Sequence, residues 1–124
     1  MISDVLIVDD SAAIRKILQC VLRQAEIPLG EVFEAADGLE ALQILETQKV
    51  NLVLVDINMP NMDGLQLLRK LKEEEQWKDL PVVMVTNEGG QAKVIAAAEL
   101  GAAGYIRKPF TADQIRHTLA TFLS

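Results

Sequence analysis

Cysteine is almost absent from this sequence: Cys20 is the single example in 124 residues. One thiol can form neither an internal disulfide nor a zinc site built from thiolates, and such scarcity is common in reducing compartments. We expect Cys20 to be a small, partly buried apolar residue among Ile17, Val21 and Leu22.

Long apolar runs and basic clusters are missing as well. Apolar runs such as residues 82–85 fall far short of the roughly 20 residues that a membrane span needs, and residues 1–4 lack the charged leader of a signal peptide. With 12 basic and 18 acidic residues the net charge is −6, and no basic cluster is longer than Arg69-Lys70. We therefore expect a cytoplasmic protein that binds proteins or cations, with no nucleic-acid or membrane partner.

A glycine-rich phosphate loop is also lacking. Residues 9–13 read DDSAA, without glycine, and no G-x-x-x-x-G-K-[ST] sequence occurs. Such loops bind nucleotide phosphates through their backbone N–H groups, so their absence disfavours a nucleotide or flavin carrier.

Five short apolar runs have the length of β-strands, and the first, third and fourth are continuous rather than alternating. Continuous runs are typical of strands covered on both faces of a parallel sheet, so the second and fifth runs are expected at the sheet edges. Segments with helical spacing separate the runs. The runs are residues 5–8, 32–33, 52–55, 82–85 and 104–106.

Helix boundaries support this alternation. Asp37 with Glu40, and Thr111 with Gln114, have the spacing of a capping box, and Gly101 follows a predicted helix as a stop signal. Crossovers of this length join parallel strands with helices on both faces. The sequence predicts an α/β fold with a doubly wound five-stranded parallel sheet, in one domain over residues 1–124.

Polar residues follow the strands where ligands bind in such folds, at the carboxyl ends. Asp9 and Asp10 follow the first run, Asp56 the third and Thr86 the fourth, while Lys108 lies just beyond the fifth. Each alone is readily explained as a helix cap or a turn residue. Their joint placement favours a functional site.

Carboxylates gathered in this way must be neutralised. Two of them 4 Å apart repel by roughly 4 kcal/mol at an effective dielectric constant near 20. A proton, a lysine or a hard divalent cation relieves that repulsion, and Mg²⁺ suits a few oxygens together with phosphate. Phosphoryl transfer needs only such positioning and charge neutralisation, so the sequence points to that chemistry.

Four motifs carry a family resemblance: VDDS at 8–11, LVDINMPNMDG at 54–64, VT at 85–86 and GAAGYIRKPF at 101–110. Together they resemble the receiver domain of two-component response regulators over the whole chain. The resemblance implies a flavodoxin-like (βα)5 fold with strand order 2-1-3-4-5.

The resemblance also implies roles for individual residues. Asp56 is the expected phosphoryl acceptor. Asp10 and Asp56 are expected to bind Mg²⁺ through their side chains, Asn58 through its backbone carbonyl and Asp9 through water. Lys108 is expected to pair with the acids and then with the phosphoryl oxygens, and its bond to Pro109 to be cis.

Thr86 and Tyr105 are the switch residues that the resemblance implies. Thr86 would donate its hydroxyl to the phosphoryl group, and Tyr105 would rotate inward and change the face of the fourth helix, fifth strand and fifth helix. Asn58 and Glu88 occupy positions that tune dephosphorylation. Asn87 departs from the family pattern, where a small residue is usual, and would narrow access.

The function implied is that of a stand-alone response regulator without an output domain, which accepts a phosphoryl group from a histidine kinase or a histidine phosphotransfer domain and controls a protein target. It would not be a turnover enzyme.

A monomer is expected, with dimerisation on phosphorylation left open, and chemotaxis is the pathway suggested by analogy. The alternatives are a phosphorelay shuttle, a phosphate sink and an unphosphorylated docking module. An aspartate-nucleophile phosphatase is disfavoured, since Asn58 stands where a second acid is expected.

Overall fold

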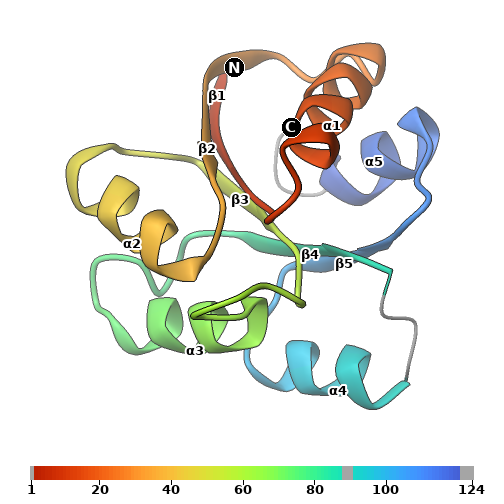
Figure 1. Cartoon of the computed structure of the whole chain (residues 1–124). Helices are drawn as coiled ribbons and strands as arrows, with labels where there is room; N and C mark the ends of the chain where they lie inside the picture. Colours follow the sequence, from red (N-terminus) through yellow and green to blue (C-terminus); the bar gives the residue numbers. More distant parts are fainter. Residues whose placement is uncertain (1, 88–90, 121–124) are drawn as a thin grey trace.

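The computed structural model describes residues 2–87 and 91–120, and its centre is a five-stranded parallel sheet (Figure 1). The strand order is β2-β1-β3-β4-β5, and every neighbouring pair is parallel. The predicted fold class and strand order are therefore confirmed. The strands are β1 Ser3–Val8, β2 Leu29–Ala35, β3 Leu52–Val55, β4 Val82–Thr86 and β5 Gly104–Arg107.

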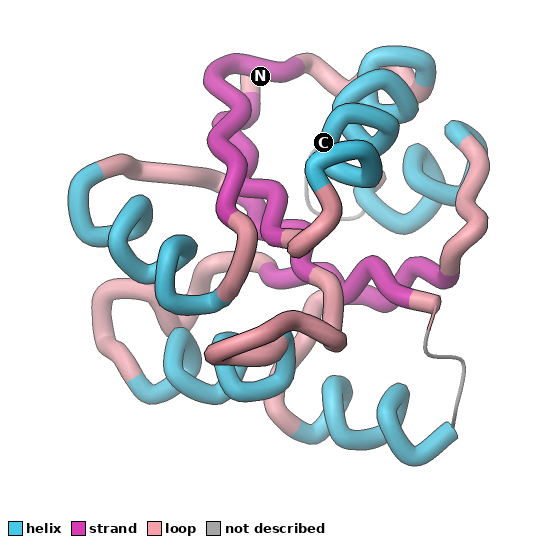
Figure 2. Tube along the Cα trace, in the orientation of Figure 1, coloured by secondary structure: helices cyan, strands magenta, loops and turns pink. Residues whose placement is uncertain are grey.

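Helices cover both faces of the sheet (Figure 2). Helices α1 and α5 pack on one face and α2, α3 and α4 on the other, so the core is divided into two apolar clusters. None of the described helices is long and apolar enough to cross a membrane. The helices are α1 Ala12–Gln24, α2 Gly38–Thr47, α3 Gly64–Glu73, α4 Gln91–Glu99 and α5 Ala112–Leu119.

The two-sided cover explains the continuous apolar runs. In β1, Leu6 and Val8 belong to the cluster under α2, α3 and α4, whereas Val5 and Ile7 belong to the cluster under α1 and α5. Successive strand residues point to opposite faces, and here both faces are buried. A polar residue inside β1, β3 or β4 would therefore be placed in one of the two cores.

The edge strands are longer than predicted. Strand β2 extends well beyond residues 32–33. The prediction was too short because Glu31 and Glu34 interrupt the apolar pattern, and this strand tolerates them since most of its side chains are only partly buried or exposed. Thr86 ends β4 rather than following it, and β5 includes Arg107. Apolar runs thus located the edge strands but underestimated their length, since edge strands tolerate polar residues.

The predicted helix caps are largely confirmed. Thr111 and Gln114 form a complete capping box at α5. At α2, Asp37 accepts a hydrogen bond from the Glu40 N–H, but the Glu40 carboxylate accepts from the Ala36 N–H, one residue earlier than a capping box requires. Both arrangements satisfy backbone donors that have no partner inside the helix.

The expected burial of Cys20 is wrong. Cys20 is exposed, and the neighbouring Ile17 is 50% exposed. The buried residues of α1 are Leu18 and Leu22, one turn apart, so the stripe that this helix buries is narrow and leaves Cys20 outside it.

Candidate functional site

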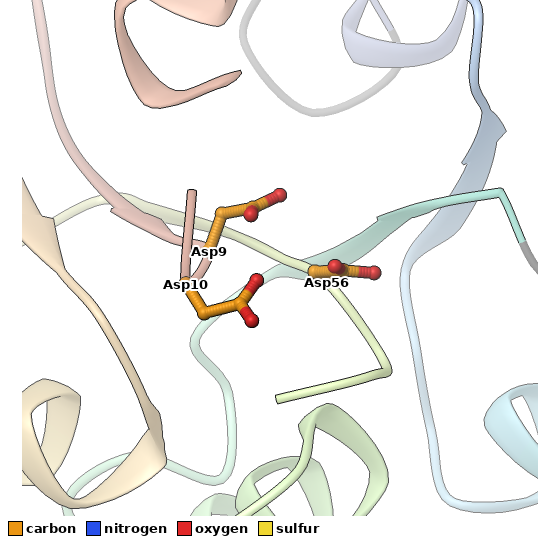
Figure 3. Close-up of side chains that lie close together, drawn as sticks. All are labelled: Asp9, Asp10 and Asp56. Carbon is orange, nitrogen blue, oxygen red and sulfur yellow. The ribbon is translucent and has the colours of Figure 1, made fainter. Parts of the chain in front are cut away.

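Three carboxylates meet at the carboxyl ends of β1 and β3 (Figure 3). Asp9, Asp10 and Asp56 each offer one oxygen within 4.8 Å of the others; Asp9 and Asp56 are buried and Asp10 is exposed. The strands that carry them are adjacent, with Val8 opposite Val55, and the Asp56 N–H donates to the Val8 carbonyl at 2.9 Å. The predicted gathering of these acids is what the structure shows.

Lys108 reaches this cluster from the end of β5. Its Nζ lies 2.8 Å from Asp9 Oδ2 and 3.5 Å from Asp56 Oδ2, and its side chain is 17% exposed. The Lys108 N–H donates to the Thr86 carbonyl at 2.9 Å, and the bond to Pro109 is cis, as expected. Among the described residues, one ammonium faces three carboxylates, so the cluster keeps an excess of negative charge.

The donor set fits a divalent cation. Among the described residues, Asp56 Oδ1 is buried and has no hydrogen-bond partner, while Asp56 Oδ2 faces Lys108. A buried carboxylate oxygen without a partner is costly unless a further ligand satisfies it. Oxygen donors with excess negative charge are those that Mg²⁺ prefers, so Asp9, Asp10 and Asp56 could hold this ion.

Gly64 allows α3 to begin directly against the backbone of Asp56, the candidate phosphoryl acceptor. A Cβ at this position would overlap the Asp56 carbonyl oxygen and lie 2.9 Å from Ile57 Cα. The Gly64 N–H donates to the Ile57 carbonyl at 2.9 Å, and Asp63 with Gln66 forms a complete capping box there. Sequence reasoning missed this box, although the signal D-x-x-Q was present.

A clasp of Asp37 and Asn61 joins the loop after β3 to the start of α2. Asn61 Nδ2 donates to Asp37 Oδ2 at 2.7 Å, and the Gly38 N–H donates to the Met62 carbonyl at 3.1 Å. Hydrogen bonds from the Glu40 N–H and then from the Asn61 amide lower the pKa of Asp37. The clasp restrains the loop that contains Asn58, whose role as a carbonyl ligand stays a prediction.

The switch candidates lie on the last two strands. Thr86 is fully buried at the carboxyl end of β4, and Tyr105 is half-buried in β5 opposite Met84. Asn87 is exposed directly after β4, and Glu88 lies outside the described residues. Thr86 thus ends its strand at the edge where the acids gather, and both switch roles stay predictions.

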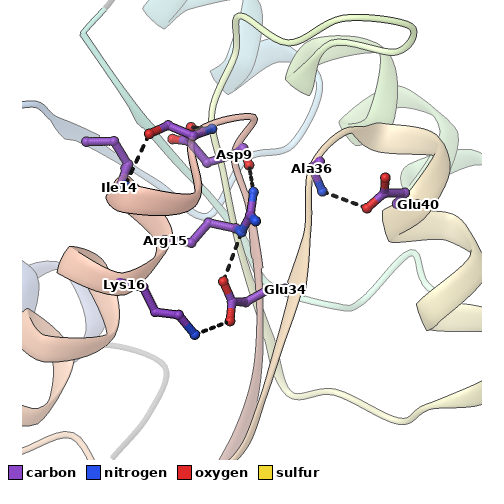
Figure 4. A network of polar contacts seen from close by, with 8 residues as sticks. Asp9, Ile14, Arg15, Lys16, Glu34, Ala36 and Glu40 are labelled. Carbon is purple, nitrogen blue, oxygen red and sulfur yellow. Dashed lines mark hydrogen bonds and ion pairs between the residues drawn. The ribbon is translucent and has the colours of Figure 1, made fainter.

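Sequence reasoning also missed a charged network beside the acids (Figure 4). Arg15 donates to the Asp9 carbonyl at 2.6 Å and to Glu34 Oε1 at 2.9 Å, and Lys16 pairs with Glu34 Oε2 at 2.8 Å. Hydrogen bonds from Lys16 and then Arg15 lower the pKa of Glu34, against the effect of burial. No spacing in the sequence signals a contact between a helix and a separate strand.

The structure also has a cavity that lies away from the acids. It measures about 570 Å³ and lies at the amino ends of β3 and β4, where Leu45, Trp77 and Leu80 line it. We place the candidate site at the acid cluster, because charged groups converge there and chemistry depends on those groups rather than on volume.

Fold and site therefore define an α/β protein with an acid cluster and a lysine at one edge of a parallel sheet. The family model described as response regulator receiver domain matches residues 5–120, and the chain belongs to this family. Receiver domains are signalling proteins that interact with histidine kinases and downstream targets, and they are not conventional enzymes.

Individual relatives agree with this assignment. A chemotaxis protein CheY homolog of Campylobacter jejuni is 40% identical over 119 residues, covering 95% of this chain and 90% of the relative. The structure of chemotaxis response regulator CheY4 of Vibrio cholerae has a TM-score of 0.86 at 33% identity, covering 99% of this chain and 100% of the other. The Mn²⁺-bound form of response regulator Rcp1 has a TM-score of 0.83 at 29% identity, with coverages of 98% and 95%.

Proposed function

We propose that this receiver is phosphorylated on Asp56 by the phosphohistidine of a histidine kinase or a histidine phosphotransfer domain. One observation carries the proposal: the carboxylate oxygens of Asp9, Asp10 and Asp56 converge within 4.8 Å, with Lys108 Nζ 3.5 Å from Asp56. Such a cluster is unfavourable without a cation and becomes useful when a phosphoryl group arrives.

The transfer is a displacement at phosphorus. An oxygen of the Asp56 carboxylate attacks, the bond from phosphorus to the partner's imidazole nitrogen breaks, and the electron pair of that bond stays on the nitrogen. Lys108 and Thr86 then contact the phosphoryl oxygens, an ammonium and a hydroxyl placed where charge develops.

Mg²⁺ is the cofactor that we propose for this transfer. Asp10 and Asp56 would hold it directly, Asn58 through its carbonyl and Asp9 through water. When bound, the ion supplies positive charge that neutralises the acids and the incoming phosphoryl oxygens. Two observations support a divalent cation here: Asp56 Oδ1 has no hydrogen-bond partner in the part of the chain that the structure describes, and response regulator Rcp1 has a Mn²⁺-bound form.

The phosphoryl group would act as a switch. It adds roughly −1.5 to −2 charges and three acceptor oxygens near Thr86. We propose that Thr86 moves toward it and that Tyr105 follows, changing the surface of α4, β5 and α5. Asn58 and Glu88 are proposed to tune dephosphorylation, and Asn87 to restrict access. The chain would dephosphorylate itself slowly and turn over no external substrate.

Chemotaxis is the pathway that we propose, because relatives from Campylobacter jejuni and Vibrio cholerae are named chemotaxis proteins. We propose a cytoplasmic monomer whose output is contact with a protein target. Pull-down with and without beryllofluoride would identify a target that binds only the activated state. A phosphorelay shuttle would instead pass the phosphoryl group to a histidine phosphotransfer domain, and a sink would lose it to water.

Intact-mass spectrometry after incubation with acetyl phosphate and Mg²⁺ tests phosphorylation. The wild type should gain one phosphoryl adduct and Asp56→Asn should gain none. Asp113→Asn is the matched control, since Asp113 is an exposed acid paired with Arg116 on α5. A wild type without adduct under forcing conditions would contradict the proposal and favour an unphosphorylated docking module.

A further inference from the structure

Arg15 connects the acid cluster to the edge strand β2. Its guanidinium donates from Nη1 to the Asp9 carbonyl at 2.6 Å and from Nε to Glu34 Oε1 at 2.9 Å (Figure 4). The Arg15 side chain is only 16% exposed, although it belongs to the first turn of α1. A planar guanidinium held at two points has a defined orientation.

With this contact every polar atom of Asp9 has a partner. The Asp9 N–H donates to the Ala35 carbonyl at 3.0 Å, Oδ1 accepts from the Ser11 N–H at 2.9 Å, and Oδ2 accepts from Lys108 at 2.8 Å. The carbonyl that Arg15 holds belongs to the peptide bond between Asp9 and Asp10. Holding it therefore fixes the orientation of the peptide from which Asp10 extends.

We propose that Arg15 is a positioning residue for the metal site, which holds the Asp9–Asp10 peptide so that the Asp10 carboxylate meets Asp9 and Asp56. The proposal rests on the proposed function, in which these acids bind Mg²⁺. Glu34 acts one step further out, because it orients the guanidinium. Contacts behind metal ligands commonly control metal affinity by restricting the motion of the ligands.

Charge and positioning predict opposite effects of removing Arg15. If Arg15 acted only through its charge, its loss would remove a cation beside the acids, and Mg²⁺ would bind more tightly. If it holds the peptide, its loss lets Asp10 move, and Mg²⁺ binds more weakly. The sign of the change in affinity therefore separates the two roles.

Lys16 provides a matched control. It pairs with the same carboxylate, at Glu34 Oε2, and carries the same charge, but its side chain is 68% exposed and, among the described residues, its ammonium pairs with Glu34 alone. Lys16→Met removes a neighbouring cation and leaves the contact from Arg15 to Asp9 in place.

Isothermal titration of the full, unphosphorylated chain with Mg²⁺ measures the effect. We expect about tenfold weaker binding for Arg15→Met, at the lower end of the range for contacts behind metal ligands. Arg15→Lys, which can reach one partner but not both, and Glu34→Gln should each lose about threefold, which is below that range because each variant keeps part of the contact. Lys16→Met should bind as the wild type does or slightly more tightly.

Modification at saturating Mg²⁺ provides the second readout. Acetyl phosphate should modify Arg15→Met at a rate near that of the wild type, because excess ion compensates for the weaker site.

Circular dichroism checks folding, and if Arg15→Met is unfolded, Arg15→Lys and Glu34→Gln decide by the same affinities. A folded Arg15→Met that binds Mg²⁺ as tightly as the wild type, or more tightly, would overturn the positioning role. A wild type that neither binds Mg²⁺ nor accepts phosphate would instead overturn the proposed function.

Discussion

The two edges of the sheet hold their charged side chains in opposite ways. At the carboxyl edge, where β1, β3 and β5 end, Asp9, Asp10 and Asp56 share the single ammonium of Lys108. At the amino edge, before β4 begins, Lys72 donates to the carbonyls of Lys78 at 3.0 Å and Leu80 at 3.2 Å. The first edge has unsatisfied negative charge, and the second has a cation that meets its acceptors.

The pKa of Lys72 reflects this setting. Burial lowers it, and the nearby Asp79 opposes that shift. The ammonium of Lys72 donates to two backbone carbonyls of the segment between α3 and β4, and it thereby ties this segment to the end of α3. Polar groups at the amino edge therefore stabilise the fold, whereas under the proposed function the acids at the carboxyl edge reduce stability until a cation binds them.

Glycine substitutions should show the largest difference between the edges. Gly64→Ala places a Cβ on the Asp56 carbonyl and should cost about 3 kcal/mol of unfolding free energy, as an overpacked and immobile contact does. Gly101→Ala, at a φ of +97°, meets only the flexible Lys72 side chain and should cost about 1–2 kcal/mol. Urea denaturation measures both, and equal losses would contradict the close approach of α3 to β3.

Removing the amino-edge cation should destabilise the protein without affecting the site. Lys72→Met leaves two carbonyls without their donor and should cost about 1–2 kcal/mol in urea denaturation. Lys70→Met, which loses only an exposed pair with Glu74 at 3.4 Å, should change stability by less than about 0.5 kcal/mol. Phosphorylation of both variants by acetyl phosphate should match the wild type, and a slower rate in Lys72→Met would argue against separate roles for the edges.

Removing an acid at the carboxyl edge should stabilise the protein, which is opposite to the effect of removing Lys72. Asp10→Asn relieves repulsion within the cluster and should raise the unfolding free energy by about 1 kcal/mol in the presence of a chelator. Millimolar Mg²⁺ should cancel that gain, because the ion stabilises the wild type more than the variant. Asp113→Asn, which breaks a surface pair with Arg116, should lower stability slightly. Loss of stability in Asp10→Asn without metal would show that the cluster is not strained by its charge.

Acid titration should give the smallest effect. Glu34 and Asp37 have pKa values below their ordinary 4.5 and 3.8. Each carboxylate therefore stabilises the folded state at pH values above its pKa in the unfolded chain, and this contribution is lost as the pH falls through its pKa in the folded protein. Stability should therefore decline as the pH falls below about 4.5. Glu34→Gln should weaken this decline, and Asn61→Ala, which removes a partner of Asp37, should weaken its lower part. Denaturation midpoints between pH 3 and 6 measure the slopes, and unchanged slopes would contradict the two pKa shifts.

Much of this architecture could be predicted from the sequence alone. Continuous apolar runs identified β1, β3 and β4, because a strand buried on both faces cannot alternate. The placement of Asp9, Asp10, Asp56 and Lys108 after strands predicted their meeting, because parallel strands end at one edge. The strand order came from family resemblance, since hydrophobic periodicity does not encode which strands are neighbours.

Tertiary structure alone decided how the cluster is held. The contacts of Arg15 with Asp9 and Glu34, and of Asn61 with Asp37, join side chains from separate elements. Periodicity records which face of an element is buried, but not the rotation of a helix against a strand or the reach of a side chain across a gap. For the same reason the exposure of Cys20 was missed, because the width of the face that α1 buries depends on what packs against it.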